Sequence, residues 1–289
     1  MAQATDRIVI EQLRYVRLGT ADLAGAADFA QRILGLQLVD RTETEAFFRS
    51  DFRDHTLVYV AGDPGYRAVG LELRDPETLD RAASRFASAG FAAGRHDAEG
   101  AWRRKARGLV VVPMPAGYDL ELVVRPLQSG WRYHGTRDAG VTGLDGVALR
   151  GAADASDQDV WTQLLAGDIS DWVGDAAFIR FDEAHHRIAV HPSSVPGILA
   201  VEFGVEDIDL VMQNTYFLRS SQVAIVDGPG RRPFSNQVFV TFAGPDGMLF
   251  SYVCEGERII GARRARQFPR QRGSFCAWGS ETAIPEFQA

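Results

Sequence analysis

Apolar and polar positions along the chain follow one order that repeats. Residues 12–18 read as a short strand, and apolar side chains at helical spacing follow as far as Leu34, where Gly35 ends the run. Further strands are predicted at 46–52 and 56–60. One strand, one helix and then two or three strands together predict a βαβββ unit.

The same order recurs three more times. The four predicted units span residues 10–65, 67–125, 143–192 and 198–256. The second and fourth units share a Pro-x-Gly turn that leads into an alternating strand, at Pro115 and Pro245. A turn that recurs at the same place in a repeated unit is a stronger signal than the turn alone. We therefore predict an α+β fold of four βαβββ modules, paired into two domains with curled mixed sheets.

The predicted domains follow from the pairing of these units. The N-terminal domain covers residues 1–130 and the C-terminal domain covers 140–256, with the boundary in a stretch rich in glycine and polar residues. Residues 257–289 form a C-terminal tail. A length of 289 residues agrees with two domains of ordinary size.

Composition and charge exclude several classes of protein. With 46% hydrophobic and 24% charged residues, the chain is neither disordered nor a coiled coil. A net charge of −7 gives no reason to expect nucleic acid or an anionic membrane as a partner. Cys254 and Cys276 are too few for a disulfide framework, and neither a signal peptide nor a membrane span is predicted. We expect a cytoplasmic homo-oligomer, with the arginines of 263–266 on a solvated face or an oligomer contact.

Four segments carry a resemblance to a known superfamily. They are Asp22…Phe29…Leu34-Gly35-Leu36, the strand Phe47-Phe48-Arg49-Ser50-Asp51, the block from Phe178 to Ala189, and the tail Arg270…Ala277-Trp278-Gly279. In these segments the chain resembles the vicinal oxygen chelate superfamily of glyoxalases, bleomycin resistance proteins and dioxygenases. Within it the sequence is most similar to two-domain type I extradiol ring-cleavage dioxygenases, over about residues 10–279. The resemblance implies that the C-terminal domain carries the active-site cavity.

The same resemblance implies Fe(II) or Mn(II) bound by two histidines and one glutamate of the C-terminal domain. The three ligand positions are occupied here by Gly146, by Ala200 or Val201, and by Ser251 or Tyr252. None of these residues is a ligand of the expected type. We therefore predict no cofactor and no metal site, with Fe as the alternative if other ligands have replaced the missing ones.

Two other sets of residues could replace the missing metal ligands. Asp145 and Glu202 lie within one or two residues of the lost positions, but alternation along a strand is expected to send Asp145 and Gly146 to opposite faces unless a bulge lies between them. The corresponding positions of the N-terminal domain, Tyr15, Ala68 and Glu121, offer one carboxylate. Neither set predicts a metal centre.

His186 is the candidate catalytic residue. It matches the histidine that the family uses as an acid/base, and an imidazole exchanges protons readily near neutral pH. An inert, hydrogen-bonded histidine at a strand edge is the alternative. The candidate substrate-binding residues are Phe178, Arg232, Thr241 and Tyr252. Core packing for Phe178 and Tyr252, and a surface position for Arg232, are the corresponding alternatives.

These positions lead to three functional hypotheses. The first is a metal-free, extradiol-dioxygenase-like protein that binds a small aromatic or polyketide-like molecule. In this hypothesis His186 is the acid/base of a non-oxidative proton-transfer reaction, which is an isomerisation, cyclisation, hydration or hydrolysis. The second is a non-catalytic protein that binds or sequesters a small molecule. The third is a true Fe(II) extradiol catechol dioxygenase with displaced ligands.

Overall fold

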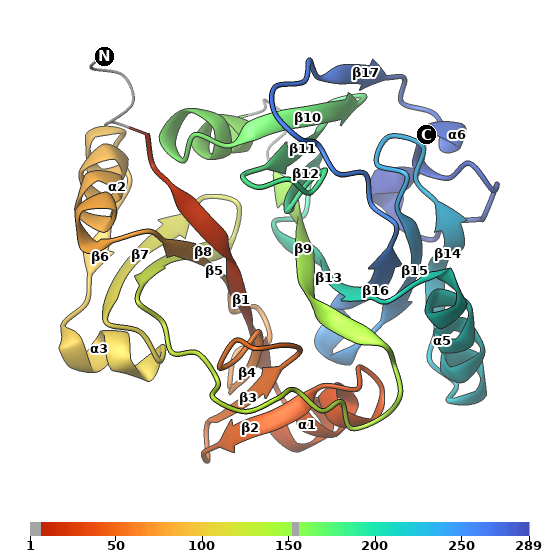
Figure 1. Cartoon of the computed structure of the whole chain (residues 1–289), viewed down its shortest axis with the longest axis horizontal. Helices are drawn as coiled ribbons and strands as arrows, with labels where there is room; N and C mark the ends of the chain where they lie inside the picture. Colours follow the sequence, from red (N-terminus) through yellow and green to blue (C-terminus); the bar gives the residue numbers. More distant parts are fainter. Residues whose placement is uncertain (1–6, 152–155, 289) are drawn as a thin grey trace.

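Two mixed sheets with few helices make up the computed structural model (Figure 1), which describes residues 7–151 and 156–288. This confirms the predicted α+β fold of four βαβββ units. The first six residues, in which no signal peptide is predicted, lie outside the described residues. None of the described helices is long and apolar enough to cross a membrane.

The first sheet has eight strands in the order β2-β3-β4-β1-β5-β8-β7-β6. Its elements are β1 (Ile10–Thr20), α1 (Leu23–Arg32), β2 (Gln37–Arg41), β3 (Glu45–Arg49), β4 (Leu57–Ala61), β5 (Arg67–Leu73), α2 (Pro76–Ser88), β6 (Gly94–Arg95), α3 (Ala98–Arg103), β7 (Gly108–Met114) and β8 (Tyr118–Val124). The strands β2 and β6, at the two edges of this sheet, lack a clear apolar pattern and are absent from the sequence-based prediction.

The second sheet has nine strands in the order β14-β15-β16-β13-β9-β12-β11-β10-β17. Its strands are β9 (Val141–Gly151), β10 (Asp168–Val173), β11 (Ala176–Arg180), β12 (Ile188–Pro192), β13 (Gly197–Val205), β14 (Ile225–Arg231), β15 (Val238–Ala243), β16 (Leu249–Cys254) and β17 (Arg266–Phe268). Its helical segments are α4 (Ser156–Asp159) with a π-helical turn (Val160–Leu164), α5 (Ile208–Ser220), α6 (Arg272–Phe275) and two 3-10 turns (Pro245–Gly247 and Pro285–Phe287). The ninth strand, β17, comes from the C-terminal tail and pairs with β10 (Figure 1).

Aspartates begin the longer helices, as the sequence pattern indicates. The side chains of Asp75 and Asp207 accept the backbone N–H of Thr78 and Leu210, which stabilises the first turns of α2 and α5. The two helices occupy the same place in the second and fourth units. The aspartate at the N-terminus of the helix is therefore a feature that the second and fourth units share.

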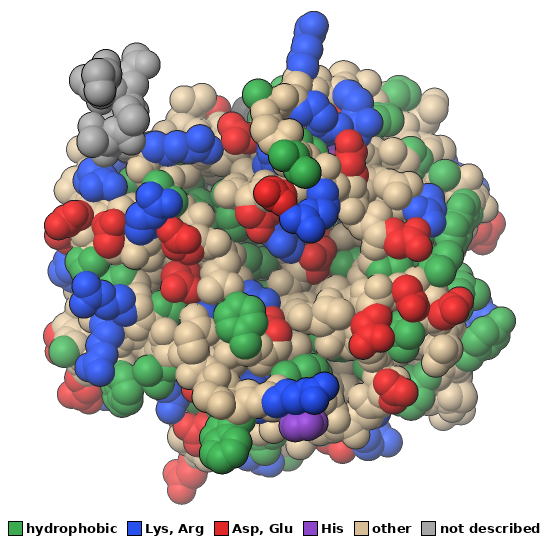
Figure 2. Space-filling model, viewed as in Figure 1, with side chains coloured by type: hydrophobic (Ala, Val, Ile, Leu, Met, Phe, Trp, Pro, Cys, Tyr) green, Lys and Arg blue, Asp and Glu red, His purple; other side chains and the backbone are tan. Residues whose placement is uncertain are grey.

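Charges of both signs are interspersed over the face of the molecule shown in Figure 2. This agrees with a modest net charge of −7 spread over 289 residues. The side chains of the candidate site lie mostly below this surface, around the second sheet.

Candidate functional site

An open cavity of about 480 Å³ lies at one end of the second sheet. It is lined by Asp145, Asp182, Glu183, Ala184, His185, His186, Arg187, Ser235, Gln237, Gly256, Glu257 and Arg258. Asp145 comes from β9, and the other residues come from the loop between β11 and β12, the loop before β15 and the segment after β16. The cavity therefore gathers parts of the chain that are far apart in sequence around the predicted catalytic residue, His186.

A second, closed space lies deeper in the same sheet, and we call it the inner chamber. It is lined by Ala148, Phe178, Ala189, His191, Ala200, Glu202, Asp227, Arg232, Phe234, Thr241, Ser251, Phe275, Ile284 and Phe287. Its free volume of about 10 Å³ holds about one water molecule. Three of the predicted substrate-binding residues, Phe178, Arg232 and Thr241, line this chamber. Tail side chains, including Phe287, close it.

Glu202 lies at the centre of the three expected ligand positions. It is paired in register with Gly146 on β9 and with Ser251 on β16. A Cβ atom added to Gly146 would lie 3.0 Å from the Glu202 Oε2 atom, so the glutamate fills the space beside the glycine. Ala200 and Glu202 are two residues apart on β13 and both line the inner chamber, as alternation along a strand predicts.

A buried ion pair joins Glu202 to Arg232. Arg232 Nη1 donates to Glu202 Oε1 at 2.7 Å and to Gln237 Oε1 at 2.8 Å, and the guanidinium lies over the Phe239 ring. Arg232 is only 7% exposed, so the alternative of a surface arginine is wrong. Close by, the Thr241 and Ser251 hydroxyls are hydrogen-bonded at 2.8 Å.

Tyr252 lies on the opposite side of its strand, away from both cavities. Its hydroxyl donates to the Ile33 carbonyl at 2.8 Å and accepts from Arg137 at 2.8 Å. Burial raises the pKa of this hydroxyl to about 12, with Arg137 opposing the shift. These contacts join the second sheet to the end of α1, so the structure gives Tyr252 a contact between the two halves of the chain.

His186 and its neighbour His185 are both buried at the wall of the open cavity. The His186 ring packs edge-on against Phe178 at 5.1 Å, which places it between the open cavity and the inner chamber. Its Nε2 atom has no hydrogen-bond partner among the described residues and lies 3.8 Å from Glu202 Oε2. Burial, together with the positive charge of neighbouring arginines such as Arg232, holds the pKa of His186 well below its usual value.

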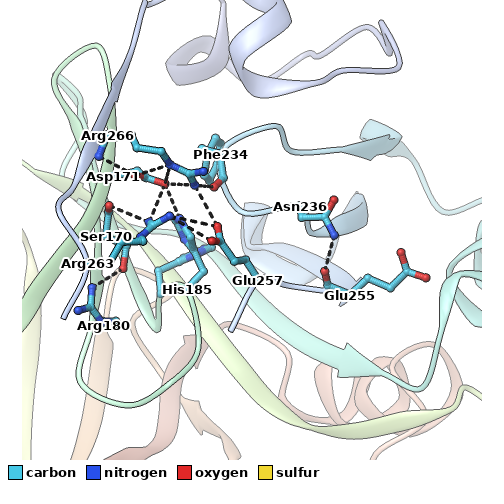
Figure 3. A network of polar contacts seen from close by, with 11 residues as sticks. Ser170, Asp171, Arg180, His185, Phe234, Asn236, Glu255, Glu257, Arg263 and Arg266 are labelled. Carbon is cyan, nitrogen blue, oxygen red and sulfur yellow. Dashed lines mark hydrogen bonds and ion pairs between the residues drawn. The ribbon is translucent and has the colours of Figure 1, made fainter. Parts of the chain in front are cut away.

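Asp171 is the centre of a polar network behind the two histidines (Figure 3). Its carboxylate lies 2.7 Å from His185 Nε2, and it accepts hydrogen bonds from the backbone and the side chain of Arg266. Arg263 also approaches it, at 3.1 Å. Burial alone would raise the pKa of Asp171, but the hydrogen bonds from Arg266 and His185 lower it to about 2.

The same network contains the residues that could bind a metal ion. Asp171, His185 and Glu257 each offer one ligand atom, and these atoms lie within 4.8 Å of one another. Two carboxylates and an imidazole are ligand types that suit Mn(II) or Fe(II). In this structure the carboxylate oxygens are bound by Arg263 and Arg266, so a metal ion would have to displace these guanidinium groups.

We expect the stability of the protein to depend on pH through Asp227, which lines the inner chamber. Burial raises its pKa to about 6, against the attraction of Arg232, whereas an unfolded aspartate titrates near 4. The raised value means that stability falls as pH rises from about 4 to above 6, because the folded state binds the proton more tightly. We expect Asp227→Asn to gain about 2 kcal/mol relative to the natural protein between pH 4 and pH 7.

Urea unfolding at several pH values measures this difference. The exposed Asp138→Asn variant is the control, and its stability relative to the natural protein should not change with pH. A constant difference for Asp227→Asn across the range would contradict the prediction.

Comparison with known proteins identifies similar families. The model of the "Glyoxalase/Bleomycin resistance protein/Dioxygenase superfamily" matches residues 12–121. This part of the chain is therefore similar to a domain of that superfamily. Biphenyl-2,3-diol 1,2-dioxygenase of Pseudomonas sp. (strain KKS102) is 26% identical over 203 residues, which cover 65% of this chain and 69% of the relative. A 1,2-dihydroxynaphthalene dioxygenase of Sphingobium xenophagum is 28% identical over 120 residues, 40% of each chain.

Solved structures from this superfamily share the fold over nearly the whole chain. The Mn(II)-bound glyoxalase from Novosphingobium aromaticivorans superposes with a TM-score of 0.87, at 21% identity, over 98% of this chain and 95% of its own. The halotolerant catechol dioxygenase BphC superposes with a TM-score of 0.86, at 22% identity, over 96% and 97%. The predicted resemblance to two-domain extradiol dioxygenases is therefore confirmed for the fold.

The prediction that the protein has no cofactor and no metal site is wrong. A relative of the same fold is a Mn(II)-bound protein, and Asp171, His185 and Glu257 form a cluster that could bind a metal ion. The ligand positions expected from the resemblance all lie on strands. These ligand atoms instead come from β10, the loop before β12 and the segment after β16, which only the fold brings together.

The arginines of residues 263–266 are expected on a solvated face or an oligomer contact, and Arg264 and Arg266 are exposed. Arg263 and Arg266 also bind Asp171 and Glu257 within the chain, which the sequence does not predict. Nothing in the sequence indicates that these arginines pair with an aspartate more than 90 residues away. Asp171 and Glu257 are accordingly the residues that sequence reasoning missed.

Proposed function

We propose that the protein binds a small aromatic or polyketide-like molecule in its C-terminal half and catalyses a proton transfer with His186 as the acid/base. The observation that carries the proposal is the Nε2 atom of His186, which is buried without a hydrogen-bond partner among the described residues. A buried polar atom normally has a partner, so an unpaired one beside a cavity is suited to a group of the ligand. Relatives named for biphenyl-diol and dihydroxynaphthalene support an aromatic ligand class.

The surroundings of His186 define how a ligand would lie. The open cavity beside His186 is large enough for a molecule of one or two rings. Because the Nε2 atom is buried and faces Glu202, the wall between the open cavity and the inner chamber would have to shift for the reacting group to meet it. Phe178 and Arg232 would provide a ring contact and a forked cation for a carboxylate or phenolate. Since the inner chamber holds about one water molecule, a ligand reaches these two residues only if the chamber widens.

A metal ion has a defined place in this proposal. Where one is bound, Asp171, His185 and Glu257 would hold it, and it would supply a positive charge that polarises a neighbouring ligand oxygen. His186 follows directly after His185 in the chain. The proton transfer proposed for His186 Nε2 does not depend on whether the ion is present.

The substitution His186→Gln tests this function. Candidate hydroxylated aromatics are first selected by the rise in melting temperature that they cause, and product is then followed by chromatography. We expect His186→Gln to lower turnover at least about 100-fold and to retain the ligand-induced rise. His55→Gln is the matched control, since His55 is equally buried at the corresponding place before β4, and its turnover should stay at the level of the natural protein. Unchanged turnover in His186→Gln would remove His186 from the mechanism.

Ring cleavage of a catechol is the second candidate function. It is favoured by the dioxygenase relatives and by the cluster of possible metal ligands. Incubation with Fe(II), dioxygen and a catechol tests it, because a ring-fission product is coloured. Ligand binding without any product in either assay would instead indicate a non-catalytic binding protein.

A further inference from the structure

The C-terminal tail forms one wall of the inner chamber. Most residues of the lining belong to strands from β9 to β16, which are hydrogen-bonded to their neighbours in the sheet. Phe275, Ile284 and Phe287 instead follow β17 and lie outside the described strands. The tail can therefore withdraw from the chamber without breaking the hydrogen bonds between the strands.

Residues 282–288 are the last described part of this tail, and we call them the plug. The backbone N–H of Ala283 donates to a carbonyl of β14 at 2.7 Å. The Glu286 carboxylate accepts from Arg150 Nε and from the Ser193 hydroxyl, each at 2.8 Å. A segment that is held in this way, outside the ladder of a sheet, opens at a lower free energy than a central strand.

Phe287 places an aromatic ring of the chain itself in the wall of the chamber. The ring is buried and stacks on Phe275, with the two ring centroids 5.2 Å apart. It also packs against the imidazole of His191 at 5.0 Å, and Phe178 packs against the same imidazole at 5.7 Å. Withdrawal of the plug would thus leave space for a ring among aromatic side chains.

The chamber also has polar groups that a phenylalanine ring cannot satisfy. His191 Nδ1 is buried and has no hydrogen-bond partner among the described residues. The hydroxyls of Thr241 and Ser251 lie in the same lining. A hydroxylated ring would bring a group that bonds to such atoms, whereas Phe287 offers none. The lining therefore suits a hydroxylated ring better than the side chain that now closes it.

We propose that the plug withdraws to admit a small hydroxylated aromatic molecule, whose ring replaces that of Phe287 and whose hydroxyl bonds to His191 Nδ1. This inference rests on the ligand binding proposed for the C-terminal half of the chain. A ligand then enters the chamber only in molecules whose plug is open, so the fraction of open molecules limits the apparent affinity. The ion pair of Glu286 with Arg150 lowers that fraction.

Hydrogen exchange of the natural protein, with and without 4-fluorophenol, tests the withdrawal. Mass spectrometry follows peptides that cover residues 282–288. We expect saturating 4-fluorophenol to speed the exchange of these peptides at least about tenfold, because withdrawal breaks the bond between Ala283 and β14. Peptides of β12 (Ile188–Pro192), on another wall of the chamber, should not exchange faster. Slower or unchanged exchange of the plug would overturn the proposal.

Two variants of the tail test the ion pair. Glu286→Gln replaces a charge-assisted bond to Arg150 by a weaker neutral one and removes no volume from the plug. We expect it to tighten the binding of 4-fluorophenol, measured by fluorine NMR, at least about fivefold. Glu281→Gln is the matched control, since the Glu281 side chain is 92% exposed and pairs with Arg272, away from the chamber lining. Equal affinities of the two variants would count against the proposal.

His191→Phe tests the contact with the hydroxyl. The variant keeps a ring in the wall but removes Nδ1, so its affinity for 4-fluorophenol should fall at least about fivefold. Its affinity for fluorobenzene, which has no hydroxyl, should stay close to that of the natural protein. Equal losses for both probes would show that His191 acts through packing alone, and would overturn its proposed role.

These measurements are separate from the turnover assay of the proposed function. Turnover without withdrawal of the plug would overturn this inference and would leave the role proposed for His186 intact. Withdrawal on addition of 4-fluorophenol, without turnover of any candidate, would support the plug and count against the proposed catalysis.

Discussion

Replacing Glu202 with leucine is expected to lower the free energy of unfolding by about 3–5 kcal/mol. The substitution leaves the Arg232 guanidinium buried, with Gln237 as its remaining hydrogen-bond acceptor. An unpaired buried charge has lost the solvation of water and has gained no partner in return. Arg232→Met should destabilise the protein by a similar amount, because it leaves the Glu202 carboxylate buried without its cation.

The double variant Glu202→Leu/Arg232→Met separates the cost of an unpaired charge from the value of the pair. We expect its stability to lie within about 1–2 kcal/mol of the natural protein, which corresponds to a large favourable coupling between the two residues. Urea unfolding of the four proteins measures this cycle. Additive losses in the double variant would show that the two charges do not stabilise one another.

Replacing Glu121 with glutamine is expected to lower the free energy of unfolding by about 3 kcal/mol. Glu121 is fully buried in the first sheet, where it accepts from the Tyr15 hydroxyl at 2.7 Å and from Arg104 Nε at 2.9 Å. Its negative charge also offsets that of the buried Arg17. Glutamine keeps the shape but removes the charge. Arg17 then keeps its ion pair with Glu45, whereas Arg104 loses its ion pair and is left with the attraction of Asp119.

Glu99→Gln is the control for this substitution. Glu99 and Arg103 form an ion pair on α3 in which both side chains are largely exposed, so its loss should change stability by less than about 0.5 kcal/mol. Urea unfolding midpoints compare the two variants. Equal midpoints for Glu121→Gln and Glu99→Gln would contradict the expectation that the Glu121 charge contributes strongly to stability because it is buried.

Local features of the fold were predictable because each is encoded within a few neighbouring residues. Asp75 and Asp207 begin helices through bonds to residues three positions on. The turns at Pro115 and Pro245 lead into strands, as their repetition predicts. His186 lies two residues before β12, close to the strand edge that the sequence pattern indicates.

Features that depend on strand register were not predictable in the same way. Gly146, Glu202 and Ser251 lie side by side because of how β9, β13 and β16 are paired. A shift of one residue exchanges the two faces of a strand, so the sequence left Ser251 and Tyr252 open as alternatives. The fold places Ser251 in the inner chamber, whereas the Tyr252 hydroxyl points to the end of α1.

The sequence by itself determined the α+β class and the four units, because helix and strand periodicity and turn residues act over short distances. The tertiary structure decided which charges lie together: Glu202 with Arg232, both buried, and Asp171 and Glu257 with Arg263 and Arg266. These partners are separated by up to 95 residues in the chain. Such pairs form because folding brings distant charges to one point and removes at least one of them, such as Glu202 or Asp171, from water.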